Sequence, residues 1–173
     1  MKSAARKSVA IKYANGQCSL GAIVVAASEA GVCAILLGDD SVAIVQDLRK
    51  RFPEARLVEA RQSLDPLMAK VIKFVDSPKA SLDVQLDAHG TQFQQRVWFA
   101  LQKIPAGATV TYTDIATEIG APRSVRAVAQ ACGANPIAVA IPCHRVVRSD
   151  GGLSGYRWGI ERKRTLLARE RAR

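Results

Sequence analysis

Two short helical patterns joined by a tight turn decide how the second half of this chain folds. Residues 113–132 read TDIATEIGAPRSVRAVAQAC. Thr113 and Asp114 can cap a first helix, which the Gly-Ala-Pro sequence at 120–122 ends. A second helix is expected to begin almost at once, over residues 124–132. Two helices around a glycine-containing turn are typical of a helix-turn-helix, although plain helical hairpins share the pattern.

The second helix of this pair carries an unusual set of side chains. Arg126 stands near its start, and the residues that follow are mostly alanine and glycine. A helix with such small side chains can lie close to another surface, and the usual partner is another helix. If the partner is DNA, the helix can enter even the minor groove, about 6 Å wide, once that groove is forced open. Arg126 is then long enough to reach into the base stack.

Further elements flank this pair on both sides. Thr91 and Gln94 fit a capping box at the start of an amphipathic helix. Residues 137–141 form an apolar segment between two prolines, which we expect to be extended. A final helix is expected over residues 161–171.

The first half of the chain has the pattern of a small α/β unit. Strand-like apolar runs cover residues 9–13, 21–27 and 32–37, and the last two are separated by a good hairpin connection. Two amphipathic helical patterns follow, and residues 81–86 alternate enough to form another strand. Nothing in this half converges on chemistry, so we predict that it is a scaffold.

The length allows one medium domain or two small domains that share an interface, and the charge is unevenly divided along the chain. Of the 173 residues, 49% are hydrophobic and 23% are charged, which is typical of a globular protein. The net charge is +10, and residues 91–173 alone hold 13 basic and 5 acidic side chains, a surplus of 8. A basic surplus beside the helical motif favours nucleic-acid binding. We expect a scaffold domain over residues 1–88 and a helical, DNA-binding domain over residues 89–173.

The sequence shows no pattern for export, for a membrane span or for a metal site. Its polar, basic start lacks the apolar core of a signal peptide, and the longest apolar runs are far too short to span a bilayer. The four cysteines lack the C-x-x-C spacing of zinc sites. We therefore expect a cytoplasmic protein, whose thiols stay reduced.

The pentapeptide Pro-Cys-His-Arg-Val at residues 142–146 carries most of the chemistry. A buried cysteine is usually inert packing, which is how we interpret the other three. Cys143 differs, because a thiol with an ordinary pKa of ~8.5 needs a base or positive surroundings to become the nucleophilic thiolate. His144 can take that proton, directly or through a water, if a carboxylate holds its other nitrogen. The alternative is that His144 is a histidine of the core.

With these residues in view, the chain strongly resembles the 6-O-alkylguanine-DNA alkyltransferases, and especially the alkyltransferase half of bacterial adaptive-response proteins. The resemblance runs from Val9 to Glu170, nearly the whole chain. It is densest at Gly90-Thr91, Phe93 to Trp98, Ile104 to Gly107, Tyr112, Arg126 to Val128, Asn135-Pro136, Ile141 to Val147, Gly155 to Gly159, Lys163 and Leu166-Leu167. It implies a small N-terminal α/β domain of the ribonuclease H-like kind, then a mainly helical domain containing the helix-turn-helix.

The resemblance also implies the catalytic residues. Cys143 matches the alkyl acceptor, and His144 matches its water-linked base. Glu170 matches the carboxylate that orients this histidine. Asn135 matches the hinge residue whose amide ties the helix-turn-helix to the cysteine loop. In the implied reaction, the alkylguanine is flipped out of the duplex and its alkyl group moves to the Cys143 sulfur. The resulting thioether is stable, so the reaction is irreversible and happens once per molecule.

Two further sets of residues are implied, one for DNA and one for the base. Tyr112 matches a residue that crowds the target phosphate, and Arg126 matches the finger that fills the space of the extruded base. The remaining members of both sets are, for DNA, Thr113 and Ser149 and, for the guanine pocket, the Val146 carbonyl, Tyr156, Arg157 and Trp158. Broadly reactive relatives have glycine where Trp158 stands. The indole is expected to narrow the pocket and favour methyl groups, unless it packs away from the pocket.

The implied partner is double-stranded DNA that contains alkylated guanine, with 4-O-alkylthymine as a poorer substrate. We expect a monomer that needs no cofactor, acts in the cytoplasm at the nucleoid and does not associate with membranes. Animal members of the family bind a structural zinc ion in the first half. Here only Cys18, Cys33 and His89 are available there, too few and too scattered, so we predict no metal.

Two other functions stay open on the residues alone. One is a thiol hydrolase or acyltransferase that uses Cys143 and His144, although neighbours on an extended backbone point in different directions and make a direct dyad awkward. The other is a sequence-specific regulator that uses the helix-turn-helix without chemistry. The alanine-rich stretch after Arg126 is poorly suited to reading base edges.

Overall fold

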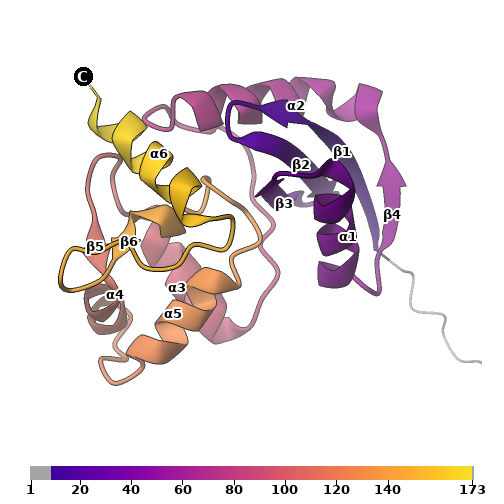
Figure 1. Cartoon of the computed structure of the whole chain (residues 1–173). Coiled ribbons are helices and arrows are strands. Elements are labelled where there is room, and N and C mark those ends of the chain that lie inside the picture. Colours follow the sequence, from indigo (N-terminus) through magenta and orange to yellow (C-terminus); the bar gives the residue numbers. More distant parts are fainter. Residues whose placement is uncertain (1–8, 173) are drawn as a thin grey trace, which may run out of the picture.

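The protein consists of a strand-rich first half and a mainly helical second half, which lie side by side (Figure 1). The computed structural model describes residues 9–172. The α/β fold class predicted from the sequence is confirmed. The boundary between domains at residues 88 and 89 stays a prediction.

The first half is built on a mixed four-stranded sheet with the order β3-β2-β1-β4. Strands β1 (Ala10–Cys18), β2 (Gly21–Ser28) and β3 (Gly31–Gly38) form an antiparallel meander, and β4 (Arg56–Glu59) pairs in parallel with β1. The centres of β2 and β3 are buried on both faces, which explains their continuous apolar runs. Helices α1 (Ser41–Arg51) and α2 (Arg61–Asp76) pack on this sheet.

The predicted hairpin between β2 and β3 is confirmed, but the strand predicted over residues 81–86 is wrong. That segment connects the two halves, and it pairs with the sheet only through an isolated bridge between Leu86 and Val32. Strand β4 was not predicted, because four residues are too few for an alternating pattern to stand out.

The second half contains three helices, two short strands, a 3-10 turn and a C-terminal helix. In chain order these are α3 (Gln92–Gln102), β5 (Val110–Thr111), α4 (Tyr112–Glu118), α5 (Val125–Gly133), the turn η1 (Cys143–Arg145), β6 (Val146–Val147) and α6 (Ile160–Arg171). Strands β5 and β6 pair in parallel. The helix-turn-helix is α4 and α5, which pack against each other and against α3.

Capping boxes begin both α3 and α4. At α3 the predicted box is present: the Thr91 hydroxyl accepts from the backbone N–H of Gln94 at 3.1 Å, and the Gln94 side-chain oxygen accepts from the Thr91 N–H at 2.9 Å. At α4 the cap is Thr111 rather than Thr113, so that prediction is wrong by two residues. The Thr111 hydroxyl accepts from the backbone N–H of Asp114 at 3.1 Å, and the Asp114 carboxylate accepts from the Thr111 N–H at 2.8 Å. The three-residue spacing that a capping box needs joins Thr111 to Asp114, whereas Thr113 lies exposed in the first turn.

The segment over residues 137–141, expected to be extended, is instead a turn. Its start pairs with strand β3, because Ile35 donates to the Pro136 carbonyl at 3.0 Å and its own carbonyl accepts from Ala138 at 2.9 Å. The chain then reverses through Val139, whose φ is +67°. This turn fastens the loop that carries the cysteine to the edge of the first-half sheet.

A glycine at the entrance to α3 packs directly on an indole of the core. A Cβ built on Gly90 would lie 2.4 Å from the six-membered ring of Trp98. Trp98 is buried, and its N–H donates to the Ala131 carbonyl at 2.8 Å, which joins α3 to α5. We expect Gly90→Ala to lower the free energy of unfolding by about 1–3 kcal/mol, or the melting temperature by roughly 2–10 °C. Calorimetry should show no such loss for Gly133→Ala, whose Cβ would meet none of the described atoms within 4 Å.

Candidate active site

Cys143 opens the turn η1 and forms part of the wall of a cavity of about 350 Å³. Its side chain is only 5% exposed. The cavity lies between α5 and the loop that precedes α6. The other lining residues are Tyr112, Ala129, Cys132, Gly133, Ser154, Gly155, Tyr156 and Arg157. The thiol therefore borders the same cavity as α5, the second or recognition helix of the helix-turn-helix.

The Asn135 side chain holds this loop from the end of α5. Its amide nitrogen donates to the Ile141 carbonyl at 2.8 Å and to the Cys143 sulfur at 3.2 Å. Its amide oxygen accepts from the Ile137 N–H at 2.9 Å. Because the side chain is fully buried, these contacts fix the turn that presents the cysteine.

His144 and Glu170 form a completely buried pair. The histidine Nε2 lies 2.7 Å from Glu170 Oε1, and the Arg145 guanidinium donates to the same carboxylate at distances from 2.8 Å. Burial alone would raise the pKa of Glu170, but the hydrogen bonds from His144 and Arg145 outweigh it and lower that pKa to about 2. Glu170 is therefore ionised at neutral pH.

The ionised carboxylate decides which nitrogen of His144 is free to act as a base. Burial lowers the pKa of His144 despite the opposing hydrogen bond and charge of Glu170, so the ring is neutral at pH 7. An ionised carboxylate can only accept, so Nε2 carries the hydrogen and Nδ1 keeps a lone pair. Nδ1 is buried and has no hydrogen-bond partner among residues 9–172. A proton acceptor is thus held one residue from the thiol.

Burial keeps the thiol itself protonated. It raises the pKa of Cys143 to about 11, although the hydrogen bond from Asn135 and the positive charge of Lys163 act in the opposite direction. At neutral pH the nucleophilic thiolate is therefore scarce until a base removes the proton. Burial alone does not make Cys143 reactive, so the thiol depends on His144 as its base.

Lys163 is a member of the site to which the sequence analysis gave no role. Its ammonium group is buried and donates to the Val146 carbonyl at 2.6 Å and to the Ser154 hydroxyl at 3.3 Å. Lys163 shares one face of α6 with Leu166, Leu167 and Glu170, which are also buried. A lysine in register with buried leucines was the signal that could have identified it.

The residues predicted for the base pocket fall into two groups. Tyr156 and Arg157 line the cavity, and so does Tyr112, which hydrogen-bonds to Ser154. Val146 and Trp158 are not among the described residues that line it. The Val146 carbonyl accepts a hydrogen bond from Lys163, and the buried Trp158 indole packs against Tyr156 in a T-shaped arrangement, with ring centroids 5.3 Å apart.

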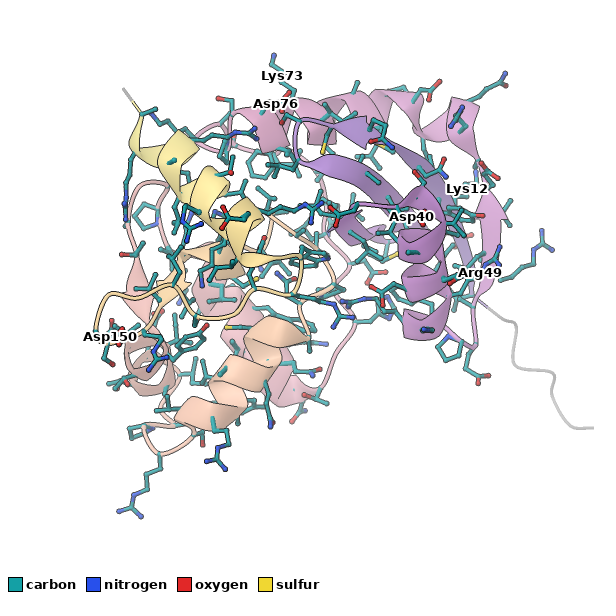
Figure 2. All side chains as sticks on the ribbon, viewed as in Figure 1. Lys12, Asp40, Arg49, Lys73, Asp76 and Asp150 are labelled. Carbon is teal, nitrogen blue, oxygen red and sulfur yellow. The ribbon has the colours of Figure 1, made fainter. Side chains whose placement is uncertain are left out.

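Three of the residues predicted to touch DNA, Thr113, Arg126 and Ser149, are exposed. Arg126 lies on the exposed face of α5, and the exposed Ala129 and Gly133 of the same helix also line the cavity. Thr113 is exposed on α4. Ser149 is exposed next to Asp150, which Figure 2 places on an outer loop beyond β6.

Residues 9–172 contain neither a cluster of possible metal ligands nor a helix that could span a membrane. No three His, Cys, Asp or Glu side chains in this range come together as possible metal ligands. No helix in the same range is both long enough and apolar enough to cross a membrane.

Comparison with known proteins places this site in a family. Residues 92–172 match the family described as 6-O-methylguanine DNA methyltransferase, DNA binding domain. The inducible methylated-DNA–protein-cysteine methyltransferase of Bacillus subtilis is 45% identical over 71% of this chain and 69% of its own length. The chain belongs to the methylated-DNA–protein-cysteine methyltransferases. This methyltransferase is also 49% identical, over 95% of its length, to the bifunctional transcriptional activator and DNA repair enzyme Ada of Escherichia coli, of which it spans only 46%.

Solved structures of Mycobacterium tuberculosis proteins share the fold of this methyltransferase. A 6-O-methylguanine methyltransferase superimposes with a TM-score of 0.72 at 36% identity, covering 93% of each chain. An OGT protein in complex with DNA superimposes with a TM-score of 0.77 at 33% identity, covering 94% of this chain and 93% of that one.

Proposed function

We propose that this methyltransferase repairs DNA by moving the alkyl group from the 6-oxygen of guanine to Cys143, once per molecule. The observation that carries the proposal is the buried Cys143 thiol on a cavity wall, next to a His144 whose Nδ1 is free to accept a proton. Methyl is the main substituent in this proposal, and 4-O-alkylthymine is a poorer substrate.

The proposed transfer balances without a cofactor. The thiol proton passes to His144 Nδ1, directly or through a water, and the sulfur electron pair forms a bond to the alkyl carbon. The bond from that carbon to the guanine oxygen breaks, its electron pair stays on the base, and the base takes up a proton. Glu170 stabilises the imidazolium that forms in between. The product is a thioether, which none of the described groups can cleave, so the molecule is spent.

The position of the thiol requires the damaged nucleotide to leave the helix. A sulfur buried at a cavity wall cannot meet a base that is still stacked, and extrusion costs a few kcal/mol, less for a poorly paired lesion. We propose that α5 lies in the minor groove, that Tyr112 crowds the target phosphate and that Arg126 fills the vacated stack. The DNA complex of the Mycobacterium tuberculosis relative supports DNA as the partner. We propose that this chain binds double-stranded DNA as a monomer.

The proposed preference for methyl groups rests on the packing of the side chains that form the cavity wall. Tyr156 forms part of this wall, and its ring packs against the buried Trp158 indole, which does not line the cavity. A braced ring cannot retreat to make room for a benzyl group. Overpacking of this kind costs about 1–3 kcal/mol.

One experiment tests the proposed function directly. The protein is incubated with duplex DNA that contains 6-O-methylguanine, and its intact mass and peptide map are recorded. We expect one added methyl group per molecule, on Cys143, and one restored guanine for each modified protein. More than one restored guanine per molecule, or an acyl adduct on Cys143, would indicate a turnover enzyme and contradict the proposal.

Binding to DNA is expected to depend strongly on salt and little on sequence. The 13 basic and 5 acidic side chains of residues 91–173 suggest several phosphate contacts, and each should contribute a slope of about 0.9 in log affinity against log salt. Arg126→Ala should slow repair of duplex DNA far more than transfer from a free alkylated base, because only the duplex has a stack to fill. Measuring both rates checks this, and equal slowing of the two would contradict the finger role.

A further inference from the structure

The cavity wall contains an arginine that is held by the first half of the chain. Arg157 lies in the loop before α6 and lines the cavity. One end of its guanidinium donates to the Gly133 carbonyl at the end of α5, at 3.0 Å. The other donates to the carboxylate of Asp47 on α1, at 3.3 Å. This side chain therefore bridges the gap between the recognition helix, the pocket loop and the first-half domain.

Asp47 holds a second arginine in the same way. Its other carboxylate oxygen lies 3.4 Å from Arg51 Nε, and Arg51 also donates to the Ala134 carbonyl at 3.5 Å. Both arginines thus contact carbonyls at the C-terminal end of α5, where free carbonyls and the helix dipole favour positive charge. Two cations packed together at this point repel each other, and the Asp47 carboxylate between them offsets that repulsion.

The position of the Arg157 guanidinium depends on this carboxylate. Its side chain is 34% exposed and that of Asp47 is 36% exposed, so the ion pair is neither free in solvent nor locked in the core. Without the carboxylate, the guanidinium keeps one hydrogen bond among those the structure shows for it, and a long side chain regains rotamer freedom. That side of the cavity would then yield to a larger group.

We propose that Asp47 is a positioning residue, which fixes Arg157 as a wall of the cavity and so restricts the size of the alkyl group that reaches Cys143. The inference rests on the proposed function, since it concerns the substituents that the same site accepts. It assigns a share of substrate selection to the first half of the chain, 110 residues away in sequence.

The chain provides a matched control for this inference. Arg162 of α6 also reaches the first half, through Asp39 at 2.6 Å. It does not depend on that carboxylate alone, because it also donates to the Leu20 carbonyl at 2.7 Å and to the Trp158 carbonyl at 2.8 Å. Arg162 is not among the described residues that line the cavity, and Asp39 is 95% exposed. Asp39→Asn therefore removes an ion pair between the two halves but leaves Arg157 in place at the cavity wall.

The experiment compares two substrates in each variant. The rate of Cys143 alkylation is measured with 6-O-methylguanine in duplex DNA and with free 6-O-benzylguanine, and the benzyl-to-methyl ratio is calculated. We expect Asp47→Asn to raise this ratio by about two- to fivefold, the range that a partly exposed ion pair supports. Asp47→Glu, which keeps the charge, should stay closer to the native ratio, and Asp39→Asn should match it.

Coupling between the two residues gives a second test. In an Arg157→Met background the ratio should no longer respond to Asp47→Asn, because the side chain through which Asp47 acts is gone. An unchanged ratio in Asp47→Asn would overturn the inference. So would an equal rise in Asp39→Asn, or a full response in the Arg157→Met background.

Salt provides a second readout, and its main measurement is made on the native protein. Salt screens a partly exposed ion pair, and free 6-O-benzylguanine avoids the phosphate contacts that make DNA binding salt-dependent. The rate at which the native protein reacts with free 6-O-benzylguanine should therefore rise with salt concentration. The rate of Asp47→Asn should depend less on salt. A salt-independent native rate would contradict the inference. If the native protein gained no methyl group from DNA, the proposed function itself would fail, which is a separate outcome.

Discussion

Replacing Cys143 by serine is expected to abolish alkyl transfer while leaving the protein able to bind DNA that contains 6-O-methylguanine. The hydroxyl fits the same space, but it is a far weaker nucleophile and His144 alone cannot deprotonate it. Loss of an essential nucleophile lowers rates by roughly 10⁴-fold or more. Intact-mass spectrometry measures the transfer, and a gel-shift assay measures the binding.

The controls use the other cysteines. Cys33 is buried in strand β3, outside the cavity, so Cys33→Ala should still gain a methyl group. Cys132 lines the cavity together with Cys143, but burial raises the pKa of its thiol and no hydrogen bond of its side chain to a base is found among the described residues. A methyl group on Cys132 in the Cys143→Ser protein would show that the acceptor had been assigned wrongly.

Loss of Glu170 is expected to have the second-largest effect, on both rate and stability. The carboxylate orients His144 and also neutralises the buried Arg145, and removing one partner of a buried ion pair typically costs about 3–5 kcal/mol. The double variant Glu170→Gln/His144→Ala should lose less transfer rate than the two single losses combined, because each substitution removes the same activation of the thiol. The rates of alkyl transfer are measured by stopping the reaction at set times, at a temperature well below the melting temperature of each variant. Additive losses would show that Glu170 acts independently of His144.

The same pair predicts how the rate depends on pH. Burial lowers the pKa of His144 from its ordinary value of about 6.5, so transfer should persist as the pH falls through that value and decline only below it, as Nδ1 is protonated. From pH 7 to 9 the rate should be nearly flat, because the proton moves within the site. If the thiolate instead formed by simple ionisation, with a pKa of about 11, the rate would rise tenfold per pH unit over that range.

Acid should also weaken the fold, for a reason that lies with Glu170. Its pKa is about 2 in the folded protein and about 4.3 in an unfolded chain, so its contribution to stability is fully present above about pH 4.3. That contribution disappears as the pH falls toward 2, because the carboxyl group then binds a proton in both states.

The sequence predicted best the elements whose signals are local. Capping-box residues and amphipathic spacing located α3, and the two apolar runs joined by a short turn located the β2–β3 hairpin. The turn over residues 137–141 was missed because its shape comes from hydrogen bonds to Ile35, a residue distant in the sequence. The cap of α4 was misplaced for a different reason: Thr111 and Thr113 both satisfy the general preference for a capping threonine, and only the three-residue spacing to Asp114 distinguishes Thr111.

The active residues divide along the same line. Cys143 and His144 were conspicuous because they are neighbours in one pentapeptide. The residues alone gave no reason to pair Glu170 with His144 rather than any other carboxylate, and only the resemblance to a family suggested it. Asp47 gave no signal at all, because an aspartate on an amphipathic helix looks like any solvated charge until its partner is known.

Helix α6 has a consequence for the order in which the protein folds. Through Arg169 it reaches the Val75 carbonyl, 94 residues earlier, and through Arg162 the Leu20 carbonyl, 142 residues earlier. Such contacts close long loops, so they form late in folding and contribute to slow kinetics. The same helix carries Glu170, so the proton acceptor is oriented only when these closures are complete. A chain in which these contacts have not yet formed lacks the hydrogen bond between Glu170 and His144, so we expect Cys143 to gain its oriented base only with the complete tertiary structure.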